Sequence, residues 1–474
     1  MAMFIIFAYS IMQLSLLIRY WRRRETKKSV NRLENYPHVL VQLPVFNEYY
    51  VVERLIDAAV NLHYPKNKLH IQVLDDSTDE SFQLARDRVE RYRREGFDIE
   101  HVRRPDRKGF KAGALQYGLG ISDAPYIVVF DADFVPEKDF ILRTLPEFEN
   151  PEIGMVQTRW GHLNRHYSLL TRVQAFALDA HFTVEQMGRN LGSHFINFNG
   201  TAGIWRRKCI DDAGGWSADT LTEDLDLSYR AQLKNWKFKF LEDVVSPAEL
   251  PAEMNALKNQ QYRWNKGAAE CYRKHLKKVL ISRRLPINTR FHALFHLGNS
   301  SVFIWIMICA VLSLPLVYIK TSHPEFKLIF ALGGTLLLSF AILGAFYYTS
   351  FRRTEGKRKK AEFLWIYPAF LSISMGMSLH NARAVWLGYI GKRTPFIRTP
   401  KWNIIGTGGS WSGKKYLGKK ISLLTWIEGF LILYFAAALV FEIWIGEYGF
   451  IPLHLMLIFG FGAVFIYSIR HSQA

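Results

Sequence analysis

The stretch Ile127-Val128-Val129-Phe130-Asp131-Ala132-Asp133 decides the fold that this sequence predicts. Four large apolar residues in succession, three of them β-branched, are typical of a short strand that is buried on both faces. Two carboxylates follow this strand at once. Because open α/β sheets bind ligands in the crevice at the carboxyl ends of their parallel strands, the stretch predicts a strand that ends in a binding site.

A second stretch of the same kind lies upstream, where Ile71-Gln72-Val73-Leu74 precedes Asp75-Asp76-Ser77. Around both stretches, short apolar runs alternate with amphipathic segments. Such alternation favours βαβ units and a mostly parallel sheet, so the predicted fold class is α/β. Strands are expected at Val39 to Leu43, Leu69 to Leu74 and Tyr126 to Phe130, and helices at Tyr50 to Leu62 and Glu80 to Arg94.

Composition divides the 474 residues into two kinds of sequence. Residues 36–270 are mixed in character and long enough to bury a sizeable core, whereas most of the remainder is apolar and broken by basic clusters. Much of the net charge of +19 lies beside apolar segments, and residues 271–290 hold seven basic side chains and no acidic one. This is the pattern of cytoplasmic loops under the positive-inside rule. Since no nucleic-acid motif accompanies it, we expect anionic lipid and the phosphate groups of a small ligand as the negative partners, and no nucleic acid.

Several segments approach the roughly 20 apolar residues that a helix needs to cross a bilayer. Met1 to Ile18 is uncharged and is followed by basic residues, so we interpret it as an uncleaved anchor with its N-terminus outside. Four more spans are expected at Ser301 to Ile319, Leu328 to Phe351, Leu423 to Trp444 and Phe450 to Ile469.

The uncharged stretch Phe363 to Leu379 allows two interpretations. As a span, it would place the following loop, with eight basic side chains in residues 391–420, outside. As a helix in the cytoplasmic interface, it keeps every basic cluster inside, and both Pro368 and the amphipathic continuation Asn381 to Tyr389 suit that arrangement. We therefore expect five spans and one interfacial element.

The first candidate binding residues follow the predicted strands. Asn47 and Glu48 stand where a helix begins and a nucleotide has room to bind, with simple helix capping as the alternative. One carboxylate of Asp75 and Asp76 can accept a hydrogen bond from a base N–H or bind ribose, although Asp-Asp-Ser is often only a turn. Lys111 follows a glycine turn at a helix start, where lysine and backbone N–H groups suit phosphate.

Two further pairs of carboxylates can carry the chemistry. Asp131 and Asp133 offer the hard oxygens that Mg²⁺ or Mn²⁺ prefers, and such a metal keeps positions for substrate phosphate. Thr222-Glu223-Asp224 supplies carboxylates that can act as a general base and take a proton from an attacking hydroxyl. A helix capping box is the alternative interpretation of this second motif.

The most specific motif is Gln260-Gln261-Tyr262-Arg263-Trp264. Arg263 can pair with the oxygens of a diphosphate, and Trp264 offers a large, rigid apolar face to a pyranose. A guanidinium and an indole in adjacent positions therefore predict a site that can bind both a diphosphate and a pyranose.

These motifs, in this order and spacing, resemble those of the processive family 2 glycosyltransferases, whose membrane-bound members make cellulose, chitin, hyaluronan and mannans. The resemblance extends from about Pro37 to Trp402 and looks closest to the cellulose-synthase-like mannan and xyloglucan-backbone synthases of plants. The flanking phrases at residues 42–48, 198–203 and 394–396 are similar to theirs.

The resemblance implies a GT-A type nucleotide-sugar-binding domain with a transmembrane bundle and interfacial helices. It also implies roles for single residues. Nucleotide contacts would come from Asp75, Asp76 and Lys111, sugar and metal binding from Asp131, and the main metal ligand from Asp133. The base would be Asp224 beside Glu223. Gln260 and Arg263 would bind substrate, Trp264 would hold the terminal sugar of the acceptor, and Phe396, Thr399 and Lys401 would belong to a gating loop.

Two positions depart from the family pattern. The plant relatives often follow the tryptophan with Ser-Cys-Gly, whereas this chain has Asn265-Lys266-Gly267, which leaves the donor open between UDP-glucose and GDP-mannose. In the gating-loop-like segment, Arg398 replaces an aliphatic residue.

We therefore expect an inverting, processive, membrane-embedded hexosyltransferase that uses Mg²⁺ or Mn²⁺, extends a β-linked glucan or mannan, and passes it across the membrane. The alternatives are a transferase that adds one sugar to a polyprenyl phosphate or a glycolipid, and a catalytically idle scaffold or transporter subunit. The catalytic domain would face the cytoplasm, in a plasma, inner or Golgi-type membrane; the sequence leaves accessory subunits or a homo-oligomer open.

The expected division of the chain follows from these segments. It comprises an N-terminal anchor and basic flank (1–28), a GT-A domain (36–270), interfacial helices (271–300), a transmembrane pair (301–351), an interfacial helix (361–390), a gating-loop-like basic loop (391–420) and a second transmembrane pair (421–474).

Overall fold

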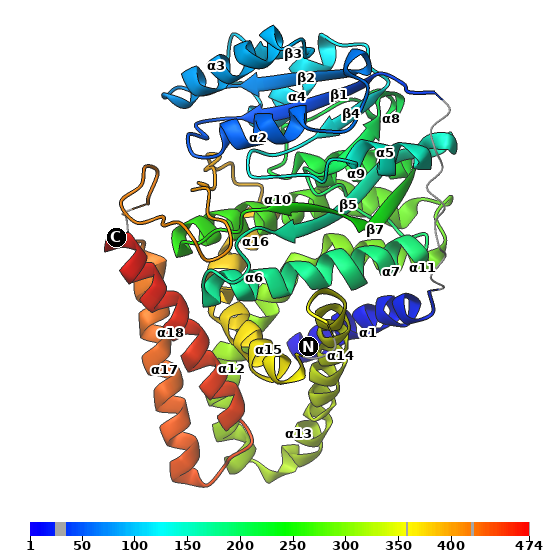
Figure 1. The fold of residues 1–474 in the computed structure, drawn as a ribbon. Coiled ribbons are helices and arrows are strands. Elements are labelled where there is room, and N and C mark those ends of the chain that lie inside the picture. Colours follow the sequence, from blue (N-terminus) through cyan, green and yellow to red (C-terminus); the bar gives the residue numbers. More distant parts are fainter. Residues whose placement is uncertain (24–34, 357–358, 419–420, 474) are drawn as a thin grey trace.

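The computed structural model describes residues 1–23, 35–356, 359–418 and 421–473. An α/β part lies above a bundle of long helices, and the basic loop that follows α16 runs up beside the α/β part (Figure 1). Residues 24–28 of the predicted basic flank lie outside the described residues, as do four positions of the predicted basic loops.

A seven-stranded sheet forms the centre of the α/β part, in the order β3-β2-β1-β4-β6-β5-β7. Only β6 is antiparallel to its neighbours β4 and β5, and the other adjacent pairs are parallel. The prediction of a mostly parallel sheet is therefore confirmed. The strands are β1 (Val39–Val45), β2 (Leu69–Asp75), β3 (Ile99–Val102), β4 (Tyr126–Val129), β5 (Ile153–His162), β6 (Gly203–Arg206) and β7 (Lys237–Ala248).

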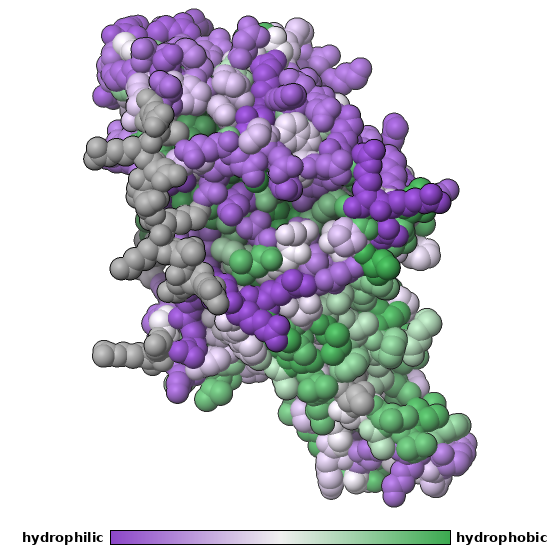
Figure 2. Space-filling view, turned by 90° about the vertical axis from the view of Figure 1, so that its right-hand side faces the viewer, coloured by the Kyte–Doolittle hydropathy of each residue, from purple (hydrophilic) through white to green (hydrophobic). Residues whose placement is uncertain are grey.

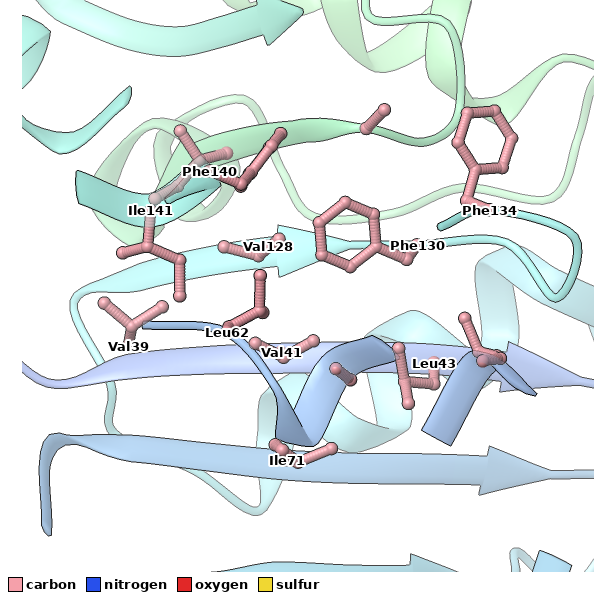
Figure 3. Packing of buried hydrophobic residues seen from close by; sticks show 14 of the residues in the cluster. Val39, Val41, Leu43, Leu62, Ile71, Val128, Phe130, Phe134, Phe140 and Ile141 are labelled. Atoms are coloured by element: carbon pink, nitrogen blue, oxygen red, sulfur yellow. The ribbon is translucent and has the colours of Figure 1, made fainter. Parts of the chain in front are cut away.

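Helices cover both faces of the sheet, as strands with two apolar faces require. Val39, Val41 and Leu43 of β1 point into one buried cluster, and Leu40 points into another on the opposite face. Figure 3 shows the first cluster, where the β1 side chains pack beside Val128 of β4. The helices of this part are α2 (Val52–Val60), α3 (Ser81–Arg94), α4 (Phe110–Gly120), α5 (Phe140–Thr144), α6 (Leu169–Ala180), α7 (Gln186–Leu191), α8 (Arg207–Asp212) and α9 (Glu223–Leu233).

Ten further helices join the α/β part to the bundle and form the bundle itself. Within the described residues, five helical stretches are long and apolar enough to cross a membrane: Ala2–Trp21, Asn299–Ser322, Pro324–Thr354, Leu423–Ile445 and Ile451–Gln473. Figure 2 shows a hydrophobic band below the hydrophilic α/β part, with a hydrophilic tip at the far end. The helices are α1 (Ala2–Trp21), α10 (Met254–Ile281), α11 (Ile287–Leu297), α12 (Val302–Ser322), α13 (Lys327–Gly333), α14 (Thr335–Thr354), α15 (Lys360–Gly376), α16 (Ser378–Tyr389), α17 (Leu423–Ile445) and α18 (Ile451–Gln473).

The helix α1 runs across the direction of α17 and α18 and lies beneath α7 (Figure 1). It packs closely on α7, because a Cβ on Gly188 would lie 2.7 Å from the carbonyl oxygen of Leu16. At its end, the Tyr20 hydroxyl donates to Glu242 of β7 over 2.9 Å. Hydropathy predicts a spanning anchor here. The orientation of a helix also depends on what it packs against, and the apolar sequence alone does not reveal its packing partners.

The stretch with two interpretations forms α15 and α16, which meet at an angle of 51°. α15 packs tightly on α18, since a Cβ on Gly376 would lie 2.2 Å from the carbonyl oxygen of Gly460. α16 packs instead along α10, the long helix that also enters the α/β part. The bent pair therefore joins the bundle to the α/β part.

Candidate active site

A cavity of about 200 Å³ lies at the carboxyl ends of β1 and β4. It gathers residues from both halves of the α/β part and from the loop after α16. The predicted site residues that line it are Glu48, Asp76, Lys111, Asp131, Asp133, Glu223, Asp224, Gln260, Arg263, Trp264, Phe396, Thr399 and Lys401.

Two predicted site residues do not line the cavity. Asn47 uses its side-chain oxygen to accept the Thr78 N–H over 2.9 Å, and α2 begins after Val51 without a side-chain cap, so Asn47 neither caps that helix nor faces the cavity. Asp75 is buried, and its two oxygens accept the Ser77 N–H and contact His101, each over 2.8 Å. Both side chains thus hold the turn after β2, and Asp75 also joins that turn to β3 through His101.

One part of the cavity, which we name the charged end, is formed by Glu48, Asp76, Lys111, Asp131, Asp133, Arg398 and Lys401. Asp76 is held by Arg104, whose Nε and Nη2 atoms lie 2.8 and 2.5 Å from the two carboxylate oxygens. Arg107, which the sequence analysis missed, lies with its guanidinium 3.3 Å from the centre of the Phe46 ring. The carboxylates here thus already have cationic partners within the protein.

Lys111 reaches the charged end because α4 begins at a left-handed glycine, Gly109, with φ of +74°. Its ammonium donates to Asp131 Oδ1 over 2.5 Å and to the carbonyl oxygen of Gly200 over 2.8 Å. Burial disfavours the charged form, but Asp131 and Glu223 outweigh burial and raise the pKa of Lys111. Lys111 is therefore a fixed positive charge beside the predicted sugar- and metal-binding carboxylate.

The predicted metal ligands Asp131 and Asp133 both face the cavity. Asp133 Oδ2 accepts a hydrogen bond from the Lys401 ammonium over 2.7 Å. Among the described residues, no three side chains of His, Cys, Asp or Glu form a closed ion site. Two carboxylates with an open side still fit Mg²⁺ or Mn²⁺, because these ions are commonly held by one or two carboxylates together with substrate phosphate.

The predicted base, Asp224, lies in the first turn of α9, which begins at Glu223. The Thr222 side chain does not cap this helix, and its hydroxyl lies 3.5 Å from Cys271 Sγ instead. Asp224 Oδ1 accepts the Leu225 N–H over 2.8 Å. Burial and the neighbouring Glu223 raise the pKa of Asp224 to about 7, which suits a group that must accept a proton near neutral pH.

Glycine at position 200 lets the backbone approach this base. Its φ is +82°, and a Cβ there would lie 3.0 Å from Asp224 Oδ2. On the other side, α10 supports the loop before the base, because the Leu221 N–H donates to Glu270 over 2.8 Å. A Cβ on Gly267 would lie 2.5 Å from Thr222 Cγ2, so this glycine also permits close packing.

The loop of residues 394–401 covers the cavity. Phe396 stacks on Phe110 with ring centres 5.3 Å apart, and the Arg263 guanidinium donates to the Thr399 hydroxyl over 3.0 Å. Arg398 forms an ion pair with Glu48 at 2.8 Å. Burial raises the pKa of Glu48 to about 7, and Arg398 opposes this effect. The position that departs from the family pattern is thus engaged with a predicted ligand-binding carboxylate.

A buried carboxylate that the sequence analysis missed anchors this loop. Glu249 follows β7, and its two oxygens accept the backbone N–H groups of Trp402 and Asn403 over 2.8 and 2.9 Å. The signal was available, because Glu249 also follows an apolar residue at the end of a strand. It was weak because β7 mixes charged and apolar residues and was not expected as a strand.

The opposite part of the cavity, which we name the aromatic end, is uncharged. It is formed by Trp160, His162, Leu178, Leu250, Pro251 and Trp264. The rings of Trp160 and Trp264 have centres 6.4 Å apart and are tilted by 52°. Asp224 of α9 and Arg263 of α10 line the same cavity, so a base and a cation are available to its ligands.

Comparisons with known proteins agree with the resemblance of the motifs. A family model described as Glycosyl transferase family group 2 matches residues 126–351. Glucomannan 4-beta-mannosyltransferase 2 of Arabidopsis thaliana is 36% identical over 389 residues, which are 80% of this chain and 70% of that protein. Probable glucomannan 4-beta-mannosyltransferase 3 of Oryza sativa subsp. japonica is 36% identical over 365 residues, which are 75% of this chain and 63% of that protein.

This chain is shorter than the curated relatives that it matches, and the matched part spans 53 to 70% of the length of the first three. Among solved structures, a mannosyltransferase of Pyrobaculum calidifontis in complex with GDP-Man and Mn²⁺ aligns with a TM-score of 0.48 and 19% identity. That alignment covers 74% of this chain and 99% of the other. It is too distant to support an inference about ligands.

Proposed function

The chain belongs to glycosyltransferase family 2, among cellulose-synthase-like proteins whose curated members are glucomannan 4-beta-mannosyltransferases, and we propose that it extends a β-linked mannan or glucomannan from GDP-mannose. Its α/β part is a GT-A type domain with a mostly parallel sheet. The proposal concerns the donor, the acceptor and the processive character of the reaction.

One observation carries the proposal: a half-buried carboxylate, whose pKa burial and a neighbouring glutamate raise to about 7, borders the same cavity as a cluster of cations and a tryptophan. Asp224 is that carboxylate, Lys111, Arg263 and Lys401 are the cations, and Trp264 is the aromatic residue. Transfer of a sugar from a diphosphate donor needs these three kinds of group. A base must deprotonate the acceptor, cations must hold the diphosphate, and an apolar face must position the acceptor sugar.

At the charged end, the chain's own residues would bind and orient the donor. Lys111 and Lys401 each pair with a carboxylate in this structure, and Arg263 donates to the uncharged hydroxyl of Thr399. A diphosphate would provide oxygens for these cations. The loop carrying Thr399 and Lys401 would then exclude water from a donor that hydrolyses easily.

Asp131 and Asp133 are the residues that would hold a divalent cation, since both are carboxylates on the open side of the charged end. When bound, Mg²⁺ or Mn²⁺ neutralises the negative charge that develops on the departing diphosphate. Lys401 would neutralise part of the same charge, because its ammonium lies beside Asp133.

At the other side of the reaction, Asp224 would take the proton of the attacking acceptor hydroxyl. Direct attack on the anomeric carbon, without a covalent intermediate on the protein, inverts its configuration and gives a β-linked product from an α-linked donor. Glu223 lies 3.9 Å from the Lys111 ammonium. Its repulsion of a negative charge on Asp224 would help to keep the pKa of Asp224 near 7.

We propose further that the product stays bound and passes into the helix bundle, with the α/β part on the cytoplasmic side. Trp264 lies on α10, whose buried Lys258 pairs with Glu428 of α17 at 2.7 Å, so the acceptor subsite and the bundle share a rigid connection. The division into a GT-A domain, interfacial helices and transmembrane pairs is part of this proposal. UDP-glucose as a second donor would give the mixed backbone that the relatives' names indicate.

The experiment is to incubate membranes that contain the chain with labelled GDP-mannose or UDP-glucose, alone and together, and to digest the product with linkage-specific hydrolases. We expect an insoluble product from GDP-mannose that β-1,4-mannanase degrades. A lipid-extractable product with a single sugar would instead support the alternative, a transferase to polyprenyl phosphate or a glycolipid.

A further inference from the structure

Two polar atoms in the wall of the aromatic end are buried and have no hydrogen-bond partner. They are the indole Nε1 of Trp160 and Nδ1 of His162. The His162 side chain is only 1% exposed, and both residues line the cavity. A buried polar atom without a partner is destabilising, so such atoms in a cavity wall suggest a ligand that supplies the missing bonds.

The strand places these two atoms on the same wall. Trp160 and His162 are two residues apart on β5, so their side chains point to the same face. Just before them, the pairing of β5 with β7 shifts register between Thr158 and Arg159. Such irregularities re-aim side chains and often occur next to active sites.

The Trp160 ring is held in a fixed orientation. It stacks on Phe182 with ring centres 4.8 Å apart, and it meets the edge of Phe134 at 5.2 Å. Phe182 belongs to a π-helical turn, His181–Glu185, between α6 and α7. In the same turn His181 contacts the amide of Asn199 over 3.1 Å, next to the glycine that approaches the base. Single π-helical turns often occur at functional sites, and this one supports the indole from behind.

The proton of His162 is fixed as well. Its Nε2 lies 3.1 Å from the buried carboxylate of Asp179, which also pairs with Arg165 at 2.6 Å. Burial lowers the pKa of His162, and Asp179 opposes this effect without reversing it. The imidazole is thus neutral at physiological pH, and because Nε2–H donates to Asp179, the other ring nitrogen Nδ1 is a bare acceptor.

We propose that Trp160 and His162 form a second carbohydrate subsite, which binds a pyranose of the acceptor chain next to the sugar held by Trp264. The indole N–H donates to one sugar hydroxyl, and Nδ1 of His162 accepts from another. Leu178, Leu250 and Pro251 complete an uncharged wall against the apolar face of the ring. This inference rests on the proposed function, because it assumes a polysaccharide acceptor.

The subsite offers the acceptor sugar one hydrogen-bond donor, the indole N–H, and one hydrogen-bond acceptor, the imidazole Nδ1, in a fixed geometry. A single sugar can occupy the subsite of Trp264 alone, whereas an acceptor of two or more sugars gains the bonds to β5. We therefore expect the chain to prefer oligosaccharide acceptors over a monosaccharide. Trp160 and His162 are positioning residues in this scheme, because they touch the acceptor away from the reacting hydroxyl.

Three conservative variants separate this role from simple packing. Trp160→Phe keeps a ring on Phe182 and removes the N–H. His162→Gln keeps an amide N–H in the position that bonds Asp179 and removes the acceptor at Nδ1, whereas His162→Asn keeps an acceptor there and loses the bond to Asp179. His166→Gln is the matched control, because His166 is exposed and does not line the cavity.

The measurement is the KM for mannose and for β-1,4-linked mannobiose, mannotriose and mannotetraose as acceptors, at saturating GDP-mannose. Each lost hydrogen bond should raise the KM for the oligosaccharides roughly two- to tenfold in Trp160→Phe and His162→Gln. The KM for GDP-mannose and for mannose itself should change less than twofold. His162→Asn should retain more of the oligosaccharide preference than His162→Gln, and His166→Gln should match the wild type.

Equal losses in His162→Gln and His162→Asn, or a parallel rise in the KM for GDP-mannose, would mean that these residues only hold the cavity wall. If the wild type transfers no mannose from GDP-mannose, the proposed function fails, and the subsite is then tested by calorimetric titration of mannotetraose into the purified chain. Binding that Trp160→Phe and His162→Gln weaken supports the subsite without the activity. Unchanged or absent binding contradicts it.

Discussion

At the charged end of the cavity the carboxylates form ion pairs with neighbouring cations, whereas at the aromatic end two neutral polar atoms are left without partners. The ion pairs of the first region are Arg104 with Asp76, Lys111 with Asp131 and Lys401 with Asp133, although Nε of Arg107 and Nη2 of Arg398 have no hydrogen-bond partner there. In the second region, the unpaired Trp160 Nε1 and His162 Nδ1 lie on a wall of stacked rings.

The difference indicates two ways of preparing a protein for a ligand. A buried charge without a partner is strongly unfavourable, so the charged end must exchange internal ion pairs for ligand contacts. A neutral polar atom without a hydrogen bond is less destabilising than an unpaired charge. The aromatic end can therefore keep the same shape with and without a ligand. We therefore expect the donor side to depend on charge and pH, and the acceptor side to depend on shape.

The largest effect is expected from replacing the proposed base, Asp224. Asp224→Asn removes the base and keeps the shape of the side chain, so transfer should fall by a factor of about 10² to 10⁴. Nucleotide binding should stay nearly intact, because the charged end is unchanged. Initial rates and GDP binding, measured on equal amounts of purified protein, test this. Near-normal polymer synthesis by the variant would remove Asp224 from the mechanism.

The next effect concerns the charged end alone. Asp133→Ala removes a predicted metal ligand and leaves Lys401 without its carboxylate, so activity should fall by roughly a hundredfold or more, which corresponds to several kcal/mol of charge stabilisation. Metal-dependent binding of GDP should weaken as well, and the readout is titration of GDP with and without Mg²⁺ or Mn²⁺. Full activity of the wild type in excess chelator would point instead to a diphosphate site made of lysine and arginine only.

Replacement of Phe396-Ile397-Arg398-Thr399 by Gly-Ser residues should slow synthesis about tenfold, as expected for the loss of one hydrogen bond to a charged group. The replacement removes the bond from Arg263 and the ion pair with Glu48, while Lys401 is kept. Folding should be unaffected, because the segment joins elements and forms no core. Polymer yields of detergent-purified wild type and variant are compared at equal protein, and equal yields would make the loop a mere connector.

The smallest effect is a pH dependence. Asp224 must be deprotonated to act as a base, and its pKa is about 7, so the rate should rise with pH and reach about half of its plateau near pH 7. Glu48 has a similarly raised pKa of about 7, so Glu48→Gln is the control. A midpoint that stays near 7 in Glu48→Gln assigns the profile to Asp224. If the midpoint near pH 7 disappears in Glu48→Gln, the pH profile belongs to Glu48 at the charged end.

Much of the fold was predictable because the first strands are short apolar runs that need no partner to be recognised. The predicted strand at Leu69 to Leu74 ends one residue before the observed β2, Leu69–Asp75. The later strands were not expected as such. β6 has only four residues, and β7 carries Lys237, Lys239 and Glu242, so pairing within the sheet rather than local pattern makes them strands.

The candidate site was predictable as a set of motifs but not as a set of contacts. The motifs indicated Lys401 and Asp133 separately, and the ion pair between them joins residues 268 positions apart. Asp75 carries the same motif signal as Asp76, yet only Asp76 faces the cavity, because one oxygen of Asp75 accepts the Ser77 N–H in the turn after β2 and the other contacts His101 of β3. Trp160 carries no motif. His162 and His166 are four positions apart and lack nearby carboxylates in sequence, which indicates a structural or interfacial role, and the unpaired atoms of Trp160 and His162 can be seen only in the folded chain.

The central claim is that this cavity builds a mannose polymer processively, and the length of the product measures it most directly. Purified chain, limiting in amount, is supplied with labelled GDP-mannose and excess mannotetraose, and the products are sized before and after β-1,4-mannanase digestion, with Asp224→Asn as the blank. The account predicts long mannanase-sensitive chains while most of the mannotetraose is still unextended. Products one sugar longer than the acceptor, or equal yields from wild type and Asp224→Asn, would contradict it.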